Sequence, residues 1–259
     1  DYLDLHYYPQ DPNGAAGQIY SSAQDSATVG RRMRSLKELY DALWSSESWI
    51  GTVDGSAGDD AAWHYTKPNL IPRVRAWIDQ YCPGTKLAIT EYAWDNEDDS
   101  QHGTISGAVA QAEVLAIFAR EGVDLATRWV APSSGSIVER AFQIFLNYDG
   151  AGANVQGDSV AATTSNIDQI GAYGFHGNGR MWLLLTNKDT VAHDVSIALH
   201  QARNAAWKLY GFDAANAVHQ IGSGGTVNGT SLSLTALTPM SANLLVIPDN
   251  DDIFKNGFQ

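Results

Sequence analysis

The chain has 259 residues, of which 44% are hydrophobic and 17% are charged, and its formal net charge is −13. This composition is typical of a globular protein, and the length allows one large domain or two smaller ones. The negative charge argues against nucleic acid or an anionic membrane as a partner, because both bind cationic surfaces. A neutral ligand fits this charge better.

Aromatic residues are more informative than cysteine in this sequence. The single Cys82 excludes an internal disulfide and has no second Cys or His at zinc-ligand spacing. Eight Trp and eleven Tyr are many for this length. Flat rings of this kind stack on the apolar faces of sugars, although we expect most of them to lie in the core.

The first half of the sequence alternates predicted strands with predicted helices. A β-rich run ends at Pro9, and two further strands are predicted at residues 86–92 and 125–130. Apolar periodicity and end signals predict helices at residues 29–44, 68–82, 106–121 and 137–147. This order predicts a parallel sheet covered by helices.

After residue 149 the pattern changes to short alternating strands separated by turn residues, which is typical of a β-sandwich. The predicted strands are residues 170–175, 181–186, 191–199, 207–212, 231–237 and 243–247. We therefore expect an α/β part at residues 1–149, a β-sandwich at 150–248 and a polar tail at 249–259. The first nine residues contain no start or targeting signal, so we also expect a segment upstream.

Glu91 is the leading candidate for a catalytic residue. It follows the apolar run of residues 86–90. A carboxylate at the C-terminal end of a buried parallel strand lies at the catalytic face of a (β/α)₈ barrel. A solvated glutamate at a strand end is the alternative interpretation.

Two other predicted strand ends carry groups that suit a sugar. By strand alternation His6 and Tyr8 point to one side, where they would bond or stack with substrate. Trp129 ends the strand at 125–130 and would form a stacking floor. Each of these side chains could equally belong to the core.

Taken in order, these segments resemble glycoside hydrolase family 44. The resemblance is carried by DYLDLHYYP at residues 1–9, LIPRVRAWIDQY at 70–81, PGTKLAITEY at 83–92, GAVAQAE at 107–113 and DLATRW at 124–129. It covers residues 1 to about 150 well and the rest only loosely. Such enzymes pair a (β/α)₈ barrel with a β-sandwich and cleave β-1,4-glucans internally, often including xyloglucan.

The resemblance implies that Glu91 is the nucleophile of a retaining enzyme. His6 would end the sixth barrel strand, Glu91 the seventh and Trp129 the eighth, so the chain would be the C-terminal half of the catalytic module. The acid/base glutamate would lie upstream, on a missing N-terminal partner segment. His6, Tyr8, Tyr92 and Trp129 would bind the β-glucan, with Trp49 and Trp63 as weaker candidates.

The acidic run DNEDD at residues 95–99 departs from the shorter, glycine-containing turn expected at this position in the family. Its oxygens could hold a structural Ca²⁺, but the regular spacing and glycine of an EF-hand are missing, so a solvated acidic loop is favoured. We therefore assign no metal ligand, and the resemblance implies no required cofactor.

Alternative functions remain open at this point. Another retaining hydrolase with a barrel and a sandwich, such as a xylanase or an arabinofuranosidase, would share these features. A carbohydrate-binding fragment without catalysis is the alternative from a different class. The resemblance also implies an extracellular enzyme.

Overall fold

The structure is a computed structural model that describes residues 1–10, 19–48, 67–95 and 103–249. The chain divides into two compact units, Asp1–Glu139 and Arg140–Gln259. This division falls earlier than the boundary at residue 149 expected from the sequence, so the helix predicted at 137–147 belongs mostly to the second unit.

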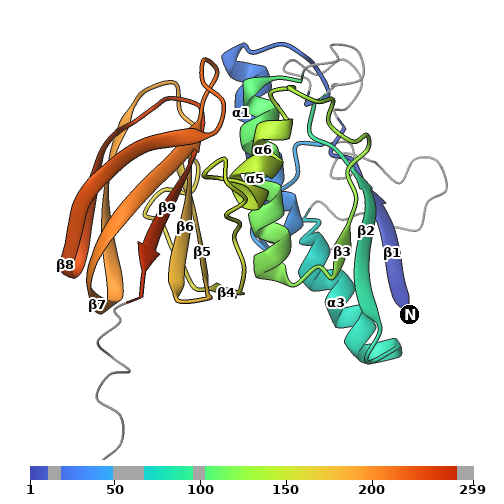
Figure 1. The fold of residues 1–259 in the computed structure, drawn as a ribbon. Coiled ribbons are helices and arrows are strands. Elements are labelled where there is room, and N and C mark those ends of the chain that lie inside the picture. The colour runs from blue at the N-terminus through green and yellow to red at the C-terminus, as the bar shows by residue number, and fades with distance from the viewer. Residues whose placement is uncertain (11–18, 49–66, 96–102, 250–259) are drawn as a thin grey trace, which may run out of the picture. The chain divides into compact units, whose positions relative to one another are not determined.

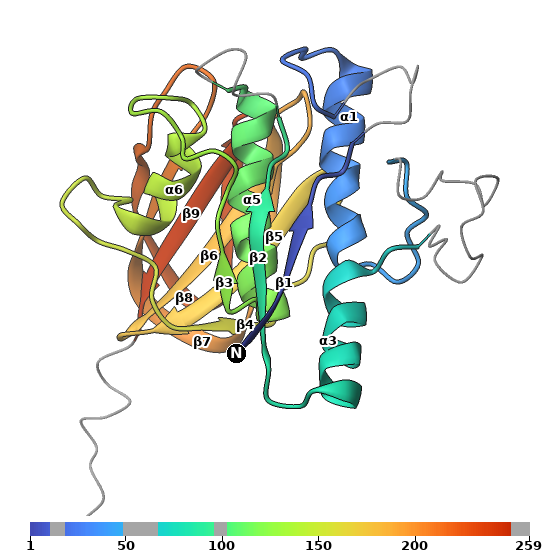
Figure 2. The ribbon, with the colours of Figure 1, turned by 90° about the vertical axis from the view of Figure 1, so that its right-hand side faces the viewer.

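The first unit contains a three-stranded sheet in the order β1-β2-β3, and both strand pairs are parallel as predicted. Three α-helices of this unit lie on one side of the sheet (Figure 1; Figure 2). The elements are β1 Tyr2–Tyr7, α1 Ser26–Ser35, the 3-10 helix η1 Leu36–Leu39, α3 Leu70–Tyr81, β2 Lys86–Tyr92, α5 Ile105–Glu121 and β3 Leu125–Ala126.

The helix ends follow local capping chemistry. The side chain of Asp25 accepts hydrogen bonds from the first turn of α1, so this helix begins before residue 29, where the apolar pattern alone placed its start. It ends at Ser35 and continues as η1, so the predicted helix to residue 44 is too long. Gly122 closes α5 with a φ of 72°, a left-handed conformation that glycine adopts without strain.

A one-residue irregularity in the pairing of β1 with β2 determines to which side of the sheet the side chains at the C-terminal end of β2 point. Leu5 pairs with Ile89, but His6 pairs with Glu91, so β2 contains one extra residue at this point. A single extra residue reverses the side-chain alternation beyond it. Without it, Glu91 would point to the same side as Ile89, which is fully buried.

Side chains confirm the two faces of the sheet. Tyr7 and Tyr92, the next pair along, are both buried. On the opposite face the carboxylate of Asp4 accepts hydrogen bonds from the amide and the hydroxyl of Thr90, at 3.1 and 2.6 Å. This second face, which carries Asp4, His6, Thr90 and Glu91, is called the polar face below.

The second unit is built on a six-stranded sheet in the order β4-β5-β6-β9-β7-β8, and every strand pair in it is antiparallel. Helix α6 begins at the boundary between the units. The elements are α6 Glu139–Leu146, β4 Asp158–Val160, β5 Ile170–Gly177, β6 Arg180–Asn187, β7 His193–Phe212, β8 His219–Leu237 and β9 Ser241–Pro248.

Two long strands replace the shorter ones predicted here. The predicted strands at 191–199 and 207–212 are one strand, β7, which pairs with β8 along its length and with β9 only at Lys208–Phe212. Bulges interrupt the β7–β8 register at several places. The antiparallel strands β7 and β8 form a long hairpin, and one apolar core contains residues from both of its strands and from β6 and β9. The buried residues of this core are Leu183, Leu185, Ile197, Leu209, Val227, Leu232, Leu234, Leu237, Leu245 and Ile247.

Candidate active site

Glu91 lies near the C-terminal end of β2, and two side chains contact it. His6 belongs to β1, and Tyr8 directly follows that strand. The Tyr8 hydroxyl donates a 2.9 Å hydrogen bond to Oε2 of Glu91. Nδ1 of His6 lies 3.2 Å from the same oxygen. The side chain of Glu91 is 30% exposed, so the carboxylate is both oriented and accessible. The prediction that His6 and Tyr8 point to one side is confirmed.

A buried hydroxyl network anchors the end of β1. Glu38, on η1, is fully buried and accepts hydrogen bonds from the hydroxyls of Tyr7, Ser46 and Ser48. Burial raises the pKa of the Glu38 carboxyl and also raises the pKa of the Tyr7 phenol. Because Tyr7 lies between His6 and Tyr8, this network fixes the backbone that carries the two contacts to Glu91.

Trp129 lies three residues beyond β3, because the strand predicted at residues 125–130 already ends at Ala126 in the structure. Its backbone amide donates a 3.0 Å hydrogen bond to the carbonyl of Tyr92, the residue after Glu91. The peptide bond from Trp129 to Val130 is cis. Trp129 is 52% exposed. An exposed tryptophan whose backbone is bonded to the residue after Glu91 is a suitable platform for a sugar ring.

Tyr92 is a correction to the sequence analysis. It is only 1% exposed, and its ring packs edge-on against Phe118 of α5 at 5.0 Å between centroids. Gln111 donates a 3.1 Å hydrogen bond to its hydroxyl. Burial raises the pKa of Tyr92 to about 12. Its burial on the helix side contradicts the prediction that Tyr92 binds substrate.

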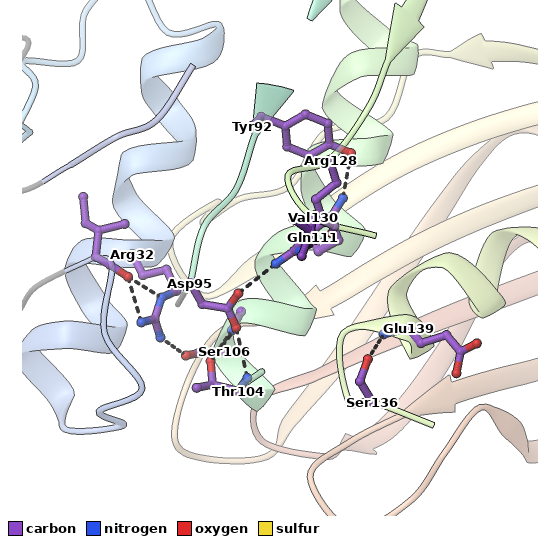
Figure 3. A network of polar contacts seen from close by, with 12 residues as sticks. Arg32, Tyr92, Asp95, Thr104, Ser106, Gln111, Arg128, Val130, Ser136 and Glu139 are labelled. Atoms are coloured by element: carbon purple, nitrogen blue, oxygen red, sulfur yellow. Dashed lines mark hydrogen bonds and ion pairs between the residues drawn. The ribbon is translucent and has the colours of Figure 1, made fainter. Parts of the chain in front are cut away.

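Asp95 is a second correction. The favoured interpretation was a solvated acidic loop, but Asp95 is buried and lies 3.1 Å from the guanidinium of Arg128 (Figure 3). Its other oxygen accepts hydrogen bonds from the amide and hydroxyl of Thr104. The rest of the acidic run, residues 96–99, lies outside the described residues. Within the described part of the chain, no group of three or more His, Cys, Asp or Glu could hold a metal ion.

Other parts of the site were missed or fall outside the described residues. Trp49 and Trp63 both lie in the segment 49–66, which the structure does not describe. Tyr20 was missed; its ring packs against Tyr8 with 6.0 Å between centroids. Asp4 was missed as well, because strand alternation gives no sign of its bonds to Thr90.

Comparison with known proteins finds relatives in sequence and in structure. No family model matches the chain. The beta-mannanase/endoglucanase A of Caldicellulosiruptor saccharolyticus is 35% identical over 178 residues, which is 67% of this chain and 13% of that protein. CelM2, a bifunctional glucanase-xylanase from a metagenome library, superposes with a TM-score of 0.81 at 34% identity and covers 96% of this chain and 44% of its own.

A third comparison carries a family assignment. A Paenibacillus polymyxa xyloglucanase of glycoside hydrolase family 44 has a TM-score of 0.79 at 29% identity, over 95% of this chain and 46% of that one. The matched regions include both units, since they cover nearly the whole chain. This chain therefore belongs to glycoside hydrolase family 44, and it spans less than half the length of each of these three relatives.

Proposed function

We propose that the protein containing this chain is a retaining, endo-acting hydrolase of β-1,4-glucans, with Glu91 as its nucleophile. The observation that carries the proposal is the carboxylate of Glu91 on the polar face, oriented by Tyr8 and His6 and left accessible. Membership of family 44 adds the reaction class to this geometry.

In the proposed mechanism the Glu91 carboxylate attacks the anomeric carbon and forms a covalent glycosyl-enzyme. A second carboxyl group about 5 Å away protonates the leaving oxygen and then activates the water that releases the sugar. Tyr8 and His6 keep the attacking carboxylate in position, and Trp129 supports a sugar ring. This mechanism uses two carboxyl groups and requires no cofactor.

We place the second carboxyl group on a segment outside this chain. Among the residues that the structure describes on the polar face, the other carboxylate is Asp4, and Thr90 donates two hydrogen bonds to it. Within the described residues no further strand pairs with β1 or β3, and Leu3 and Leu125 on these strands are exposed. Open parallel edges favour a larger closed sheet. In this proposal β1, β2 and β3 are the sixth to eighth strands of a (β/α)₈ barrel completed by an N-terminal partner.

The second unit is, in this proposal, the β-sandwich that accompanies the barrel. The bulged hairpin of β7 and β8 shares one apolar core with β6 and β9, which supports two packed layers. The polar tail at residues 249–259 is not assigned a function.

The substrates follow from the relatives and from the site. The names of the relatives include endoglucanase, xyloglucanase, xylanase and mannanase activities. All of these names denote hydrolysis of polysaccharides. We propose β-1,4-glucan and xyloglucan as the substrates, and xylan and mannan are the further polysaccharides to be tested. An arabinofuranosidase would instead release single sugars from side chains.

We further propose that the enzyme acts outside the cell, where such polysaccharides occur. In the described ranges, no helix is long and apolar enough to span a membrane. The charge of −13 agrees with a neutral polysaccharide partner rather than nucleic acid or an anionic membrane.

Substitution of the nucleophile tests the proposal. In the complete enzyme, Glu91→Gln should keep the fold and reduce turnover of carboxymethyl-cellulose and xyloglucan by several orders of magnitude. Glu121→Gln is the matched control, because Glu121 ends α5 and pairs with Arg120 at 2.8 Å. Near-normal turnover by Glu91→Gln would exclude Glu91 as the nucleophile, and glucan binding without any cleavage by the wild type would favour a non-catalytic binding protein.

A further inference from the structure

The ion pair of Asp95 and Arg128 is isolated from solvent. The side chains are 2% and 3% exposed, respectively, and Nη2 of Arg128 lies 3.1 Å from Oδ1 of Asp95. The second oxygen of Asp95 accepts from the amide of Thr104 at 3.0 Å and from its hydroxyl at 3.2 Å. Breaking such a pair leaves a buried charge uncompensated, so both partners are held firmly in place.

The start of α5 is shaped to receive the Asp95 carboxylate. Thr104 caps this helix by accepting a 3.0 Å hydrogen bond from the amide of Gly107. A Cβ atom at Gly107 would lie 2.0 Å from Oδ2 of Asp95, so only glycine fits without displacing the carboxylate. The N-terminal end of a helix also favours a negative charge. Asp95 is thus fixed relative to α5 independently of Arg128.

The other end of the pair acts on the backbone around Trp129. Figure 3 shows Arg128 beside Val130, and Nη1 of Arg128 donates a 2.6 Å hydrogen bond to the carbonyl of Val130. Since these residues flank Trp129 in the sequence, the Arg128 side chain bridges across Trp129. The amide of Trp129 is itself bonded to the carbonyl of Tyr92. The backbone is therefore held on both sides of Trp129, while its indole is half exposed.

We propose that Asp95 and Arg128 are positioning residues that hold the indole of Trp129 at the sugar-binding surface beside Glu91. The inference rests on the proposed function, since it takes a glucan as the ligand of Trp129. Asp95 anchors the guanidinium to the start of α5, and the guanidinium fixes the backbone on which the indole stands. Without the contacts from Asp95 to Arg128 and from Arg128 to the backbone of Val130, the indole becomes mobile and loses part of its stacking contact with the sugar.

A double-mutant cycle on affinity tests the inference. Arg128→Lys, Trp129→Ala and their combination are made in the complete enzyme with Glu91→Gln, so that cellohexaose is bound and not cleaved. Lysine keeps the charge but cannot bond to Asp95 and Val130 with a planar fork. We expect each single variant to weaken affinity roughly threefold to tenfold, which corresponds to the loss of one aromatic contact. The combination should be no weaker than Trp129→Ala alone.

Controls separate positioning from folding and from catalysis. Arg75→Lys changes an arginine that contacts the backbone of Glu121 and the carboxylate of Asp124, and it should leave affinity unchanged. If Arg128→Lys does not fold, Asp95→Asn breaks the same pair from its other side and enters the same cycle.

The outcomes are distinct. Unchanged affinity in the folded Arg128→Lys protein, or additive losses in the combination, would overturn the inference. So would a parent protein that does not bind cellohexaose. A parent that binds and shows the expected coupling, beside a wild type that cleaves no glucan, would overturn the proposed catalytic function and leave the positioning role standing.

Discussion

Tyr8 donates its hydroxyl to the same oxygen of Glu91 that lies against the His6 imidazole, at 2.9 and 3.2 Å. Both of these side chains come from the end of β1 or the residue just after it, and Glu91 comes from β2. The one-residue irregularity between Leu5 and His6 brings them to the same face. The arrangement of the candidate active site is therefore a property of strand pairing as much as of residue identity.

The Tyr8 contact leads to a prediction about turnover. Tyr8→Phe should lower kcat/KM for xyloglucan roughly tenfold or more, because a hydrogen bond to a charged group contributes about 1.5–3 kcal/mol. Initial rates over a range of substrate concentrations measure this. Tyr2→Phe, at the other end of β1, is the control, since its ring lies under Lys86. Equal rates for the two variants would show that Tyr8 does not support the nucleophile.

Trp129 should contribute to binding more than to stability. Trp129→Ala is expected to weaken oligosaccharide binding by about 1 kcal/mol while the melting temperature changes little, because the indole is half exposed. Calorimetric titration and a thermal melt check both parts. Trp77→Ala, an exposed tryptophan on α3, should affect neither. A sharp fall in melting temperature with normal affinity would assign Trp129 to the core.

Tyr92 predicts how stability depends on alkaline pH. Its pKa is raised to about 12 by burial, so its contribution to stability is present below pH 10 and is lost as the pH rises towards 12. From pH 10 to 12 the wild type should therefore lose about 2 kcal/mol more unfolding free energy than Tyr92→Phe. Denaturant titrations at several pH values measure the difference. If the unfolding free energies of the wild type and Tyr92→Phe changed in parallel with pH, burial would not hinder ionisation of the Tyr92 phenol.

The open edges of β1 and β3 predict that the chain depends on a partner. Residues 1–259 produced alone should associate or aggregate, because unpaired strand edges and exposed side chains such as Leu3 and Leu125 remain uncovered. Addition of the N-terminal partner proposed above should restore glucanase activity. Light scattering and an activity assay measure the two effects. A fully active monomer of this chain would place the second carboxylate within it.

Much of the first unit was predictable because its signals are local. Residues 86–92 match β2, and Gly122 marks the end of α5, since apolar runs and caps act through near neighbours. The reversal of β2 at Thr90 depends on pairing with β1, and nothing in the strand itself reveals it. Strict alternation along β2 would have turned the Glu91 side chain towards the helices. The observation that Glu91 stands at the end of an apolar strand therefore predicted its accessibility better than alternation did.

The errors also have physical causes. Asp95 stands in an acidic run, and its burial depends on Thr104 beyond that run, nine residues away, and on Arg128, 33 residues away. Tyr92 directly follows Glu91, yet adjacent strand residues face opposite sides, so proximity in sequence misled. In the second unit, polar residues in the middle of β7 resembled a turn, whereas the strand continues through them with bulges.

The most direct test of the central claim locates the covalent intermediate. A 2-deoxy-2-fluoro cellobioside with a good leaving group should inactivate the complete enzyme by forming a stable ester with its nucleophile. After proteolysis, mass spectrometry should find the sugar on the peptide that contains Glu91, and Glu91→Gln should remain unlabelled. A label on any other carboxylate, or turnover with inversion of anomeric configuration and no label, would contradict the assignment of Glu91 as the nucleophile of a retaining enzyme.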